Sequence, residues 1–277
     1  MPRLPERRLR EQLIQISRLC YERRLLVALD GNLSVRLDGE LLLCTPAGCH
    51  KGLLTDAELL VVDRRGQVVR GRGQPTSEMA MHLACYRERP DVEAVVHAHP
   101  PVATAFTIAG VSLARCVLPE VVLTLGTVPT LEYDTTGTAA LAERVGQAMG
   151  AHDAVMLDRH GAVCVGPSLL DAFCKLETME HMAQVMKAAV ELGGIRDLPC
   201  DEAAKLRAMG LSRYGGPPEA VARAGEPGAD LPPACWTCGG CERTGEPAAS
   251  VAVSGERTGA VGDVDRAARQ ALRKLLG

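Results

Sequence analysis

Residues 94–114 read AVVHAHPPVATAFTIAGVSLA, and this stretch decides how the rest of the chain is interpreted. It is the longest segment without Lys, Arg, Asp or Glu, and one helix of this length could span a bilayer. Two histidines, a Pro-Pro pair and a glycine interrupt it, so the pattern instead predicts a buried strand over residues 94–98, a turn, and a helix over residues 101–108. We therefore expect no membrane span and no membrane partner.

The segments on both sides of this stretch alternate between helical and β-type patterns. The expected helices cover residues 5–27, 77–87, 138–149 and 169–191, and the expected strands cover residues 32–37, 40–44, 59–62, 67–69, 154–157 and 162–165. The first four of these strands form two hairpins. Strands interleaved with helices predict an α/β or α+β layered domain.

Composition and charge exclude several classes of partner. The 277 residues carry 31 Lys and Arg against 34 Asp and Glu, a net charge of −3, and 47% of them are hydrophobic, which is typical of a globular protein. No run of five like charges occurs and only 3% of residues are aromatic, so we expect no nucleic-acid partner. Eleven cysteines behind a charged N-terminus, where a secretory leader would be apolar, predict a reduced, cytoplasmic protein.

The composition changes near residue 211. Residues 212–262 are rich in Gly, Pro, Ala, Ser, Glu and Arg and lack sustained apolar periodicity. We therefore expect a main domain over residues 1–211 and a flexible C-terminal extension over residues 212–277, with a short helix over residues 263–276. The extension holds a C-x2-C-x2-C cluster. Its thiolates are Cys235, Cys238 and Cys241, with Cys200 as a candidate fourth. This spacing suggests a second metal site, and a reduced or redox-labile tail without metal is the alternative.

The strongest chemical signal is the HAH sequence at residues 97–99, at the end of the expected central strand. Side chains two residues apart on a strand share a face, with their Cα atoms roughly 7 Å apart, so His97 and His99 could share one divalent ion. The strand expected over residues 154–157 runs into DRHG, where Gly161 would permit a sharp turn that directs His160 to a neighbouring strand end. Three histidines and an open position are the usual ligand set of catalytic zinc.

The sequence PTSE at residues 75–78 opens an expected helix. Its ordinary interpretation is an N-cap followed by an acidic first turn. The hydroxyls of Thr76 and Ser77, together with free backbone N–H groups, also make an anion site suited to phosphate, and Glu78 lies beside it. His82 lies four residues further on the same helix face, and we interpret it as a structural partner rather than a fourth metal ligand.

The ordered set GNLSVRL, TPAG, PTSE, an H-x-H nineteen residues after Glu78 and a late His-Gly resembles the class II aldolase/adducin family, most closely its L-fuculose-1-phosphate aldolase-like branch. The resemblance covers roughly residues 8–195. It implies a three-layer α/β/α domain with a central, mainly antiparallel sheet, one zinc ion per subunit, and a homotetramer with active sites between subunits.

The resemblance also implies roles for individual residues. The matching positions are His97, His99 and His160 for zinc, Glu78 for the catalytic acid/base, and Asn32, Gly48, Thr76 and Ser77 for the substrate phosphate.

The chain departs from the family pattern at two places. Ala47 stands where the family's TPTG or TPSG turn has a hydroxyl, which removes one phosphate contact. The fuculose branch uses a tyrosine from the adjacent subunit to protonate the aldehyde oxygen, and that position aligns near Leu118. Glu120 is the nearest proton-carrying side chain, and Tyr133 is the other candidate, with a purely structural role as its alternative.

The activity implied is that of a lyase. A zinc-dependent aldolase would reversibly cleave a ketose 1-phosphate, fuculose-, deoxypentulose- or methylthiopentulose-like, to dihydroxyacetone phosphate and an aldehyde. A family dehydratase or sugar-acid phosphate decarboxylase would use the same zinc ligands, and Glu120 favours this alternative. A pentulose-phosphate 4-epimerase normally has Asp where Glu78 stands, and a non-enzymatic adducin-like module would be expected to lose metal ligands.

Overall fold

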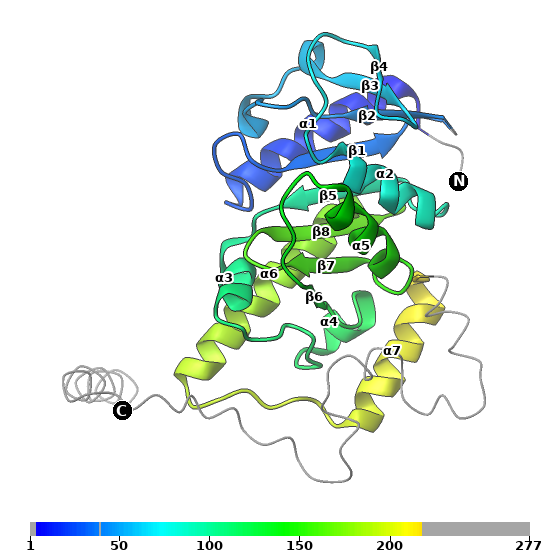
Figure 1. Ribbon diagram of the computed structural model, residues 1–277. Helices are drawn as coiled ribbons and strands as arrows, with labels where there is room; N and C mark the ends of the chain where they lie inside the picture. Colours follow the sequence, from blue (N-terminus) through cyan, green and yellow to red (C-terminus); the bar gives the residue numbers. More distant parts are fainter. Residues whose placement is uncertain (1–3, 39, 218–277) are drawn as a thin grey trace, which may run out of the picture.

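The computed structural model describes residues 4–38 and 40–217, and at their centre lies one eight-stranded sheet (Figure 1). The strands are β1 (Asn32–Arg36), β2 (Leu41–Cys44), β3 (Leu60–Asp63), β4 (Val68–Arg70), β5 (Ala94–Ala98), β6 (Thr130–Leu131), β7 (Ala154–Leu157) and β8 (Gly161–Gly166). They are ordered β4-β3-β2-β1-β5-β8-β7-β6. Within the described residues every neighbouring pair is antiparallel except β6 and β7, which are parallel.

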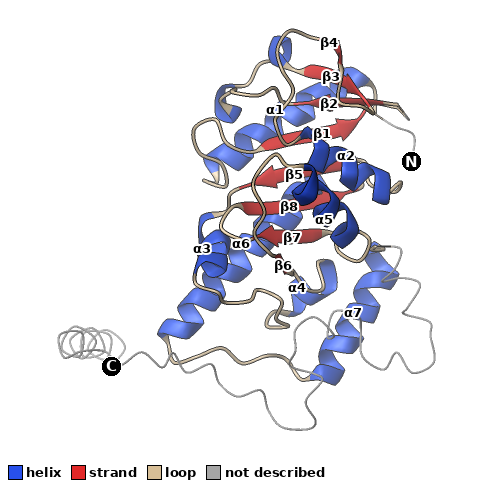
Figure 2. Ribbon diagram, viewed as in Figure 1, coloured by secondary structure: helices blue, strands red, loops and turns tan. Residues whose placement is uncertain are grey.

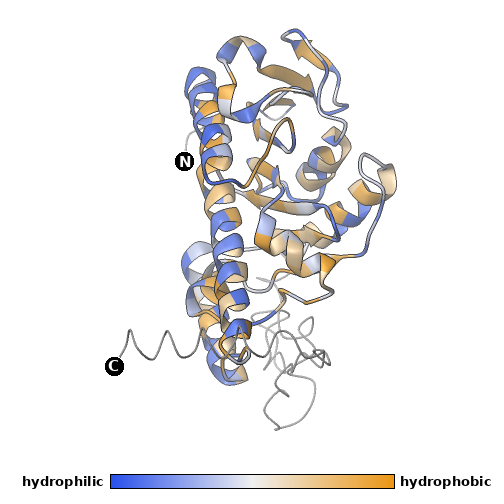
Figure 3. Cartoon of the chain, turned by 90° about the vertical axis from the view of Figure 1, so that its left-hand side faces the viewer, coloured by the Kyte–Doolittle hydropathy of each residue, from blue (hydrophilic) through white to orange (hydrophobic). Residues whose placement is uncertain are grey.

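Helices cover both faces of the sheet (Figure 2). One layer consists of α1 (Glu6–Glu22), α3 (Pro101–Ile108) and α6 (Leu169–Glu191), and the other consists of α2 (Met79–Glu88) and α5 (Ala139–Met149). Figure 3 shows the first layer from its side, with apolar and polar residues alternating along the ribbons, as expected for helices buried on one side. The predicted three-layer α/β/α architecture is confirmed.

The central strands are buried on both faces, which explains their nearly continuous apolar sequences. All five residues of β5 are buried. Val96 belongs to the core under α1 and α6, whereas its neighbour Val95 belongs to the core under α2 and α5. Alternate side chains of one strand therefore hold two helical layers in place.

Most predicted elements are present, with corrected ends. The first helix ends at Glu22 rather than at residue 27, because Arg24 has a positive φ angle of 59°, which a right-handed helix does not allow. Helix α2 begins at Met79 rather than at residue 77, and Glu78 is its N-cap residue. Two short 3-10 helices, Lys51–Leu53 and Asp56–Glu58, follow β2.

The sequence patterns did not predict α4 (Pro119–Thr124), β6 or α7 (Cys200–Tyr214). Helix α7 packs against α4, and at Gly210 there is no room for a Cβ beside the Leu123 carbonyl. Packing therefore requires Gly210, but a glycine inside a helix lowers the helix propensity of the segment. For this reason the sequence pattern did not indicate α7. Because α7 continues to Tyr214, the domain boundary predicted at residue 211 falls inside a helix.

No helix of the described segments is both long and apolar enough to cross a bilayer. The predicted terminal helix and the cluster of Cys235, Cys238 and Cys241 lie outside the described residues. Cys200 is the exposed first residue of α7.

Candidate active site

The three predicted histidines meet at one end of the central strands. His97 lies near the end of β5 and His99 just after it, while His160 lies in the turn between β7 and β8. Strand β8 pairs with both β5 and β7, which brings the two histidine-bearing ends together. On the other side of β5, the register of β1 places Asn32 directly opposite His97. Asn32 and His97 are 65 residues apart in the sequence (97 − 32 = 65) and become neighbours across the β1–β5 ladder.

The geometry of the three imidazoles fits one small cation. One ligand nitrogen from each ring lies within 4.8 Å of the others, and the Nε2 atoms of His97 and His99 are 3.1 Å apart. Two nitrogens that bind one tetrahedral zinc ion at ~2.0–2.1 Å would be about 3.3 Å apart. The spacing of the nitrogen atoms of His97, His99 and His160 is therefore suited to zinc.

Neighbouring groups orient two of these rings. His97 donates from Nδ1 to the carbonyl oxygen of Ala162 at 2.9 Å, which directs its Nε2 atom into the cluster. The Nδ1 atom of His99 faces the carboxylate of Asp30 at 3.7 Å. These contacts leave Nε2 of both rings as the candidate ligand atoms.

The turn that presents His160 differs in detail from the prediction. The left-handed residue is Arg159, with a φ of 56°, and not Gly161. The Arg159 backbone N–H donates to Thr107 Oγ1 at 2.9 Å, which holds this turn against α3. Gly161 is required for a different reason, because a Cβ there would collide with the Ala98 carbonyl and lie 2.6 Å from the His99 ring. The glycine permits close packing of the two strand ends.

Glu78 directs its carboxylate at the same cluster. Its Oε2 lies 3.1 Å from Nε2 of His97, and its Oε1 lies 3.4 Å from Nε2 of His160. Burial would raise the pKa of Glu78, but hydrogen bonds with His97 and Asn32 outweigh it and hold that pKa well below its usual value. The buried Oε1 atom has no hydrogen-bond partner. A carboxylate and three imidazole nitrogens converge here, and these are ligand types that a divalent metal ion takes in proteins.

The protonation states of the histidines suit metal binding. Burial, followed by the proximity of His97, lowers the pKa of His99 to about 3. The same two causes, in the same order, lower the pKa of His160 to about 4. Both rings are therefore neutral near pH 7, which is the form that binds a metal ion.

The two predicted phosphate-binding turns lie side by side. Pro46 and Pro75 form a β-bridge, and the Ala47 backbone N–H donates to the Gln74 carbonyl at 2.9 Å. In these turns Gly48 is exposed with a φ of 67°, and Ser77 is exposed beside the start of α2. The structure thus brings TPAG and PTSE together although thirty residues separate their first positions (75 − 45 = 30).

Thr76 and Asn32 are linked in this region. Thr76 Oγ1 accepts from the Glu78 backbone N–H at 3.2 Å and from Asn32 Nδ2 at 3.0 Å, so its own hydroxyl hydrogen remains for a further acceptor. Asn32 is buried, and its amide also donates to Glu78 Oε2 at 2.9 Å. In this arrangement Asn32 holds Thr76 and Glu78 in place from behind.

The two candidate proton donors lie elsewhere. Glu120 is exposed on α4, which packs against α7 and lies beside the β6 edge of the sheet in Figure 1. Tyr133 is 60% exposed in the segment after β6. Within one chain, the structure does not bring either residue into the histidine cluster.

Lys51 is a site neighbour that the sequence patterns did not indicate. Its side chain is buried, and Nζ donates to the carbonyls of Leu29 and Cys49 at 2.7 and 3.0 Å, which ties the segment before β1 to the segment after β2. Burial lowers the pKa of Lys51. A lone lysine in a sequence is normally taken as exposed, so no local signal marks it.

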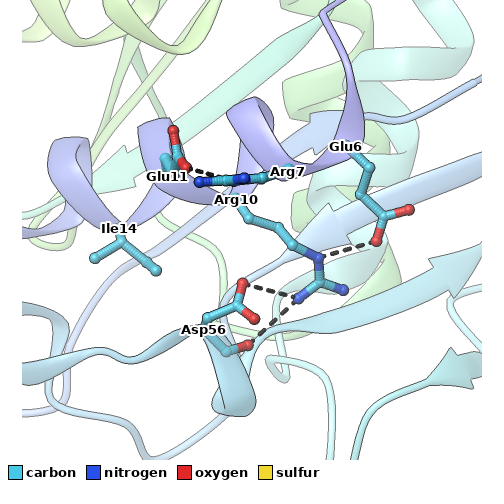
Figure 4. A pocket seen from close by; sticks show the side chains of 6 residues that line it. All are labelled: Glu6, Arg7, Arg10, Glu11, Ile14 and Asp56. Atoms are coloured by element: carbon cyan, nitrogen blue, oxygen red, sulfur yellow. Dashed lines mark hydrogen bonds and ion pairs between the residues drawn. The ribbon is translucent and has the colours of Figure 1, made fainter.

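A separate surface hollow has a different character. Figure 4 shows its lining residues, Glu6, Arg7, Arg10, Glu11, Ile14 and Asp56. Their charges are paired with one another: Arg10 with Glu6 at 2.9 Å and with Asp56 at 3.3 Å, and Arg7 with Glu11 at 3.1 Å. This hollow has no converging unpaired groups of the kind found around the histidines.

Known proteins match most of the domain. The family model for the class II aldolase and adducin N-terminal domain matches residues 11–186. The chain belongs to this family. An L-fuculose phosphate aldolase of Methanococcus maripaludis is 35% identical, over 63% of this chain and 93% of the relative. A 3-oxo-tetronate 4-phosphate decarboxylase of Haemophilus influenzae is 33% identical, over 64% of this chain and 85% of the relative.

Solved structures of class II aldolase relatives agree with the fold. YgbL from Klebsiella pneumoniae, described as a putative aldolase/epimerase/decarboxylase, has a TM-score of 0.70 and 32% identity, covering 74% of this chain and all (100%) of that one. An L-fuculose 1-phosphate aldolase has a TM-score of 0.67 and 31% identity over 72% of this chain and 94% of that one. The family resemblance found in the motifs is therefore confirmed, and this family is enzymatic.

Proposed function

We propose that this class II family member is a zinc-dependent aldolase that reversibly cleaves a ketose 1-phosphate to dihydroxyacetone phosphate and an aldehyde. The observation that carries the proposal is the position of Glu78, 3.1 and 3.4 Å from the Nε2 atoms of His97 and His160. An ionised acid/base beside a three-histidine cluster is the arrangement that proton transfer next to a carbonyl requires. The aldolase relatives support the same reaction class.

His97, His99 and His160 would hold the zinc ion. Zinc bound there supplies positive charge that stabilises the negative charge developing on substrate oxygens as the carbon–carbon bond breaks. In the synthetic direction the Glu78 carboxylate would take a proton from the carbon that attacks the aldehyde, and in the cleavage direction the protonated Glu78 would return that proton to the same carbon. Its buried, fixed carboxylate avoids the reorganisation that a solvated base would need.

The paired turns would bind the substrate phosphate. Thr76 offers the hydroxyl hydrogen that no described residue accepts, Ser77 offers an exposed hydroxyl, and Gly48 offers backbone beside open space. Asn32 supports this site by holding Thr76. Ala47, which has no hydroxyl, leaves one contact fewer than the family pattern.

The enzyme would be a cytoplasmic homotetramer in which a neighbouring subunit completes the active site. Glu120 is exposed on α4, where a neighbouring subunit could receive it as the proton donor for the aldehyde oxygen. A second candidate activity is decarboxylation of a 3-oxo-sugar acid phosphate at the same zinc site. The decarboxylase relative from Haemophilus influenzae, at 33% identity, favours this alternative.

The deciding experiment is proton exchange without any aldehyde. With zinc bound, the wild-type protein should exchange one hydroxymethylene hydrogen of dihydroxyacetone phosphate with deuterated solvent. Glu78→Gln should keep its zinc but lose exchange by about 10²-fold or more, because a positioned acid/base contributes on that scale. Glu88→Gln is the matched control, since the same change is made at the exposed far end of the same helix, and it should exchange normally.

Two results would contradict the aldolase proposal. One is no exchange in zinc-loaded wild type with dihydroxyacetone phosphate bound, and the other is undiminished exchange in Glu78→Gln. Release of carbon dioxide from a 3-oxo-sugar acid phosphate, lost in Glu78→Gln, would then establish the decarboxylase alternative.

A further inference from the structure

A chain of buried hydrogen bonds runs from Glu78 away from the histidine cluster. Glu78 Oε2 accepts from Asn32 Nδ2 at 2.9 Å, and Asn32 Oδ1 lies 2.6 Å from Nε2 of His82. The opposite ring atom of His82, Nδ1, lies 2.6 Å from Ser34 Oγ, which lies 2.9 Å from the hydroxyl of Tyr86. All five side chains are buried. The chain joins β1 to α2 behind the site.

The position of the Asn32 amide fixes the direction of every bond in this chain. Its Nδ2 atom lies 3.0 Å from Thr76 Oγ1 and 2.9 Å from Glu78 Oε2, and an amide nitrogen has two hydrogens for these two acceptors. The opposite amide orientation would place the amide oxygen against both of these oxygens. With Oδ1 therefore facing His82, the His82 proton must be on Nε2, and Nδ1 must accept from Ser34.

The outer end of the chain is consistent with this direction. Ser34 uses its only hydrogen toward His82, so Tyr86 must donate its hydroxyl hydrogen to Ser34. Burial raises the pKa of Tyr86, which keeps that hydrogen in place. Arg36 lies over the Tyr86 ring, 4.6 Å from its centroid, and donates to the Tyr86 carbonyl at 2.7 Å. The last donor is thereby anchored between β1 and α2.

We propose that His82 is a positioning residue: as a neutral imidazole with its proton on Nε2, it fixes the Asn32 amide, which in turn directs the Glu78 carboxylate at the histidine cluster and Thr76 at the substrate phosphate. The proposal rests on the proposed function, because it assigns His82 to the proton transfer that Glu78 performs. His82 contacts Asn32 and Ser34 and is not one of the three clustered histidines, so it acts on Glu78 and Thr76 through Asn32.

The burial of His82 supports a permanent role of this kind. Its ring has no exposed surface, and burial lowers its pKa to about 3. The ring therefore stays neutral across the pH range in which an enzyme works, and the direction of the chain does not reverse. A cation at this position would instead turn Nδ1 into a donor toward Ser34 and break the sequence of bonds.

The first test needs no substrate. In the wild-type protein labelled with 15N-histidine, the His82 signals, identified by their loss in His82→Gln, should show a protonated Nε2 and an unprotonated Nδ1 from pH 6 to 8. A proton on Nδ1, or a cationic ring, would overturn the assigned direction of the chain.

The second test measures proton exchange in two variants of His82. His82→Leu removes the donor to Asn32 and should lower the exchange rate at saturating dihydroxyacetone phosphate by about 10–100-fold, the usual effect of losing an outer positioning partner. Zinc content should not change, because His82 is not a ligand. His82→Gln keeps an amide N–H at the Nε2 position and should recover most of the loss.

A matched control separates positioning from general damage. Asp153→Asn alters a buried polar cluster at the opposite end of the sheet and should lower stability without lowering the exchange rate. Equal exchange in His82→Leu and wild type would overturn the proposal, as would failure of His82→Gln to exceed His82→Leu.

The two proposals fail in different ways. If wild type shows no exchange at all, the aldolase proposal fails, and the same His82 variants are then compared in the decarboxylation assay. If wild type exchanges and Glu78→Gln does not, but the His82 variants match wild type, only the positioning role is overturned. If His82→Leu does not fold, the position of the His82 proton in the NMR experiment decides.

Discussion

The two ends of strands β5, β7 and β8 carry buried polar clusters of opposite kinds. At one end, the Arg89 guanidinium donates to Asp153 at 2.9 Å, and Lys175 donates to the other oxygen of Asp153 at 2.9 Å. Each positive group there meets a negative group. At the other end, imidazole nitrogens and the Glu78 carboxylate face one another at 3.1 and 3.4 Å with no protein cation between them.

The difference separates a cluster that stabilises the fold from one that binds a ligand. The Arg89 cluster joins the end of α2, the start of β7 and the first turns of α6, and its buried charges are neutralised within the chain. The histidine cluster gathers imidazole nitrogens beside a carboxylate, which are ligand types for a metal ion. Strands β5, β7 and β8 thus carry stabilising ion pairs at one end and the candidate active site at the other.

The largest expected effect comes from removing the metal ligands. In His97→Ala/His99→Ala, with Cys235, Cys238 and Cys241 changed to Ser to exclude the second candidate site, bound divalent metal should fall from about one per chain to almost none. Metal analysis of the purified protein checks this. The cysteine variant alone, with both histidines present, is the control and should keep its metal. Full occupancy in the double histidine variant would contradict the site.

The opposite end of the strands should respond in stability instead. Asp153→Ala removes the partner that Arg89 and Lys175 share, while Arg89 keeps Asp91 and Lys175 keeps Asp171. The lost hydrogen bonds should cost about 1–3 kcal/mol of unfolding free energy. Denaturant unfolding measures the loss, and the rate constant per folded, zinc-loaded molecule should stay near the wild-type value. The control is Glu143→Ala, which removes an exposed partner of Arg87 and should cost less than about 1 kcal/mol. A specific loss of turnover in Asp153→Ala would weaken the contrast between the two ends.

The smallest expected effect is a pH dependence of stability in the metal-free protein. The pKa values of His82, His99 and His160 are lowered from 6.5 to about 3, 3 and 4 by burial. Between pH 6.5 and 4.5 the unfolded chain therefore binds protons that the folded chain does not, so the unfolding free energy should fall as pH falls through this window. Denaturant unfolding with a chelator at pH 7 and pH 5 measures it.

The two ends should titrate in different pH windows. Hydrogen bonding to Arg89 lowers the pKa of Asp91, so its contribution is present above its ordinary value of 3.8 and is lost only below that. A loss of stability between pH 6.5 and 4.5 thus reports on the histidines. Constant stability across that window would contradict their burial as neutral rings.

Local sequence patterns predicted much of this molecule. Spacing of two residues on a strand identified His97 and His99, and apolar periodicity found α6 with both of its ends and β7 with both of its ends. These features depend on neighbours in sequence, because strand alternation and helical periodicity are properties of the local backbone. The ordered motifs also indicated the family that the comparisons later established.

Tertiary structure decided the rest. The pairing of β1 with β5 places Asn32 opposite His97. The bonds of the Asn32 amide to Thr76 and Glu78 then set the proton position on His82. The sequence patterns indicated Asn32, Glu78 and His82 as site or structural residues, but they did not indicate which groups these side chains contact. Register, burial and hydrogen-bond direction arise when segments far apart in the chain exclude water between them, and no local pattern specifies which groups then face one another.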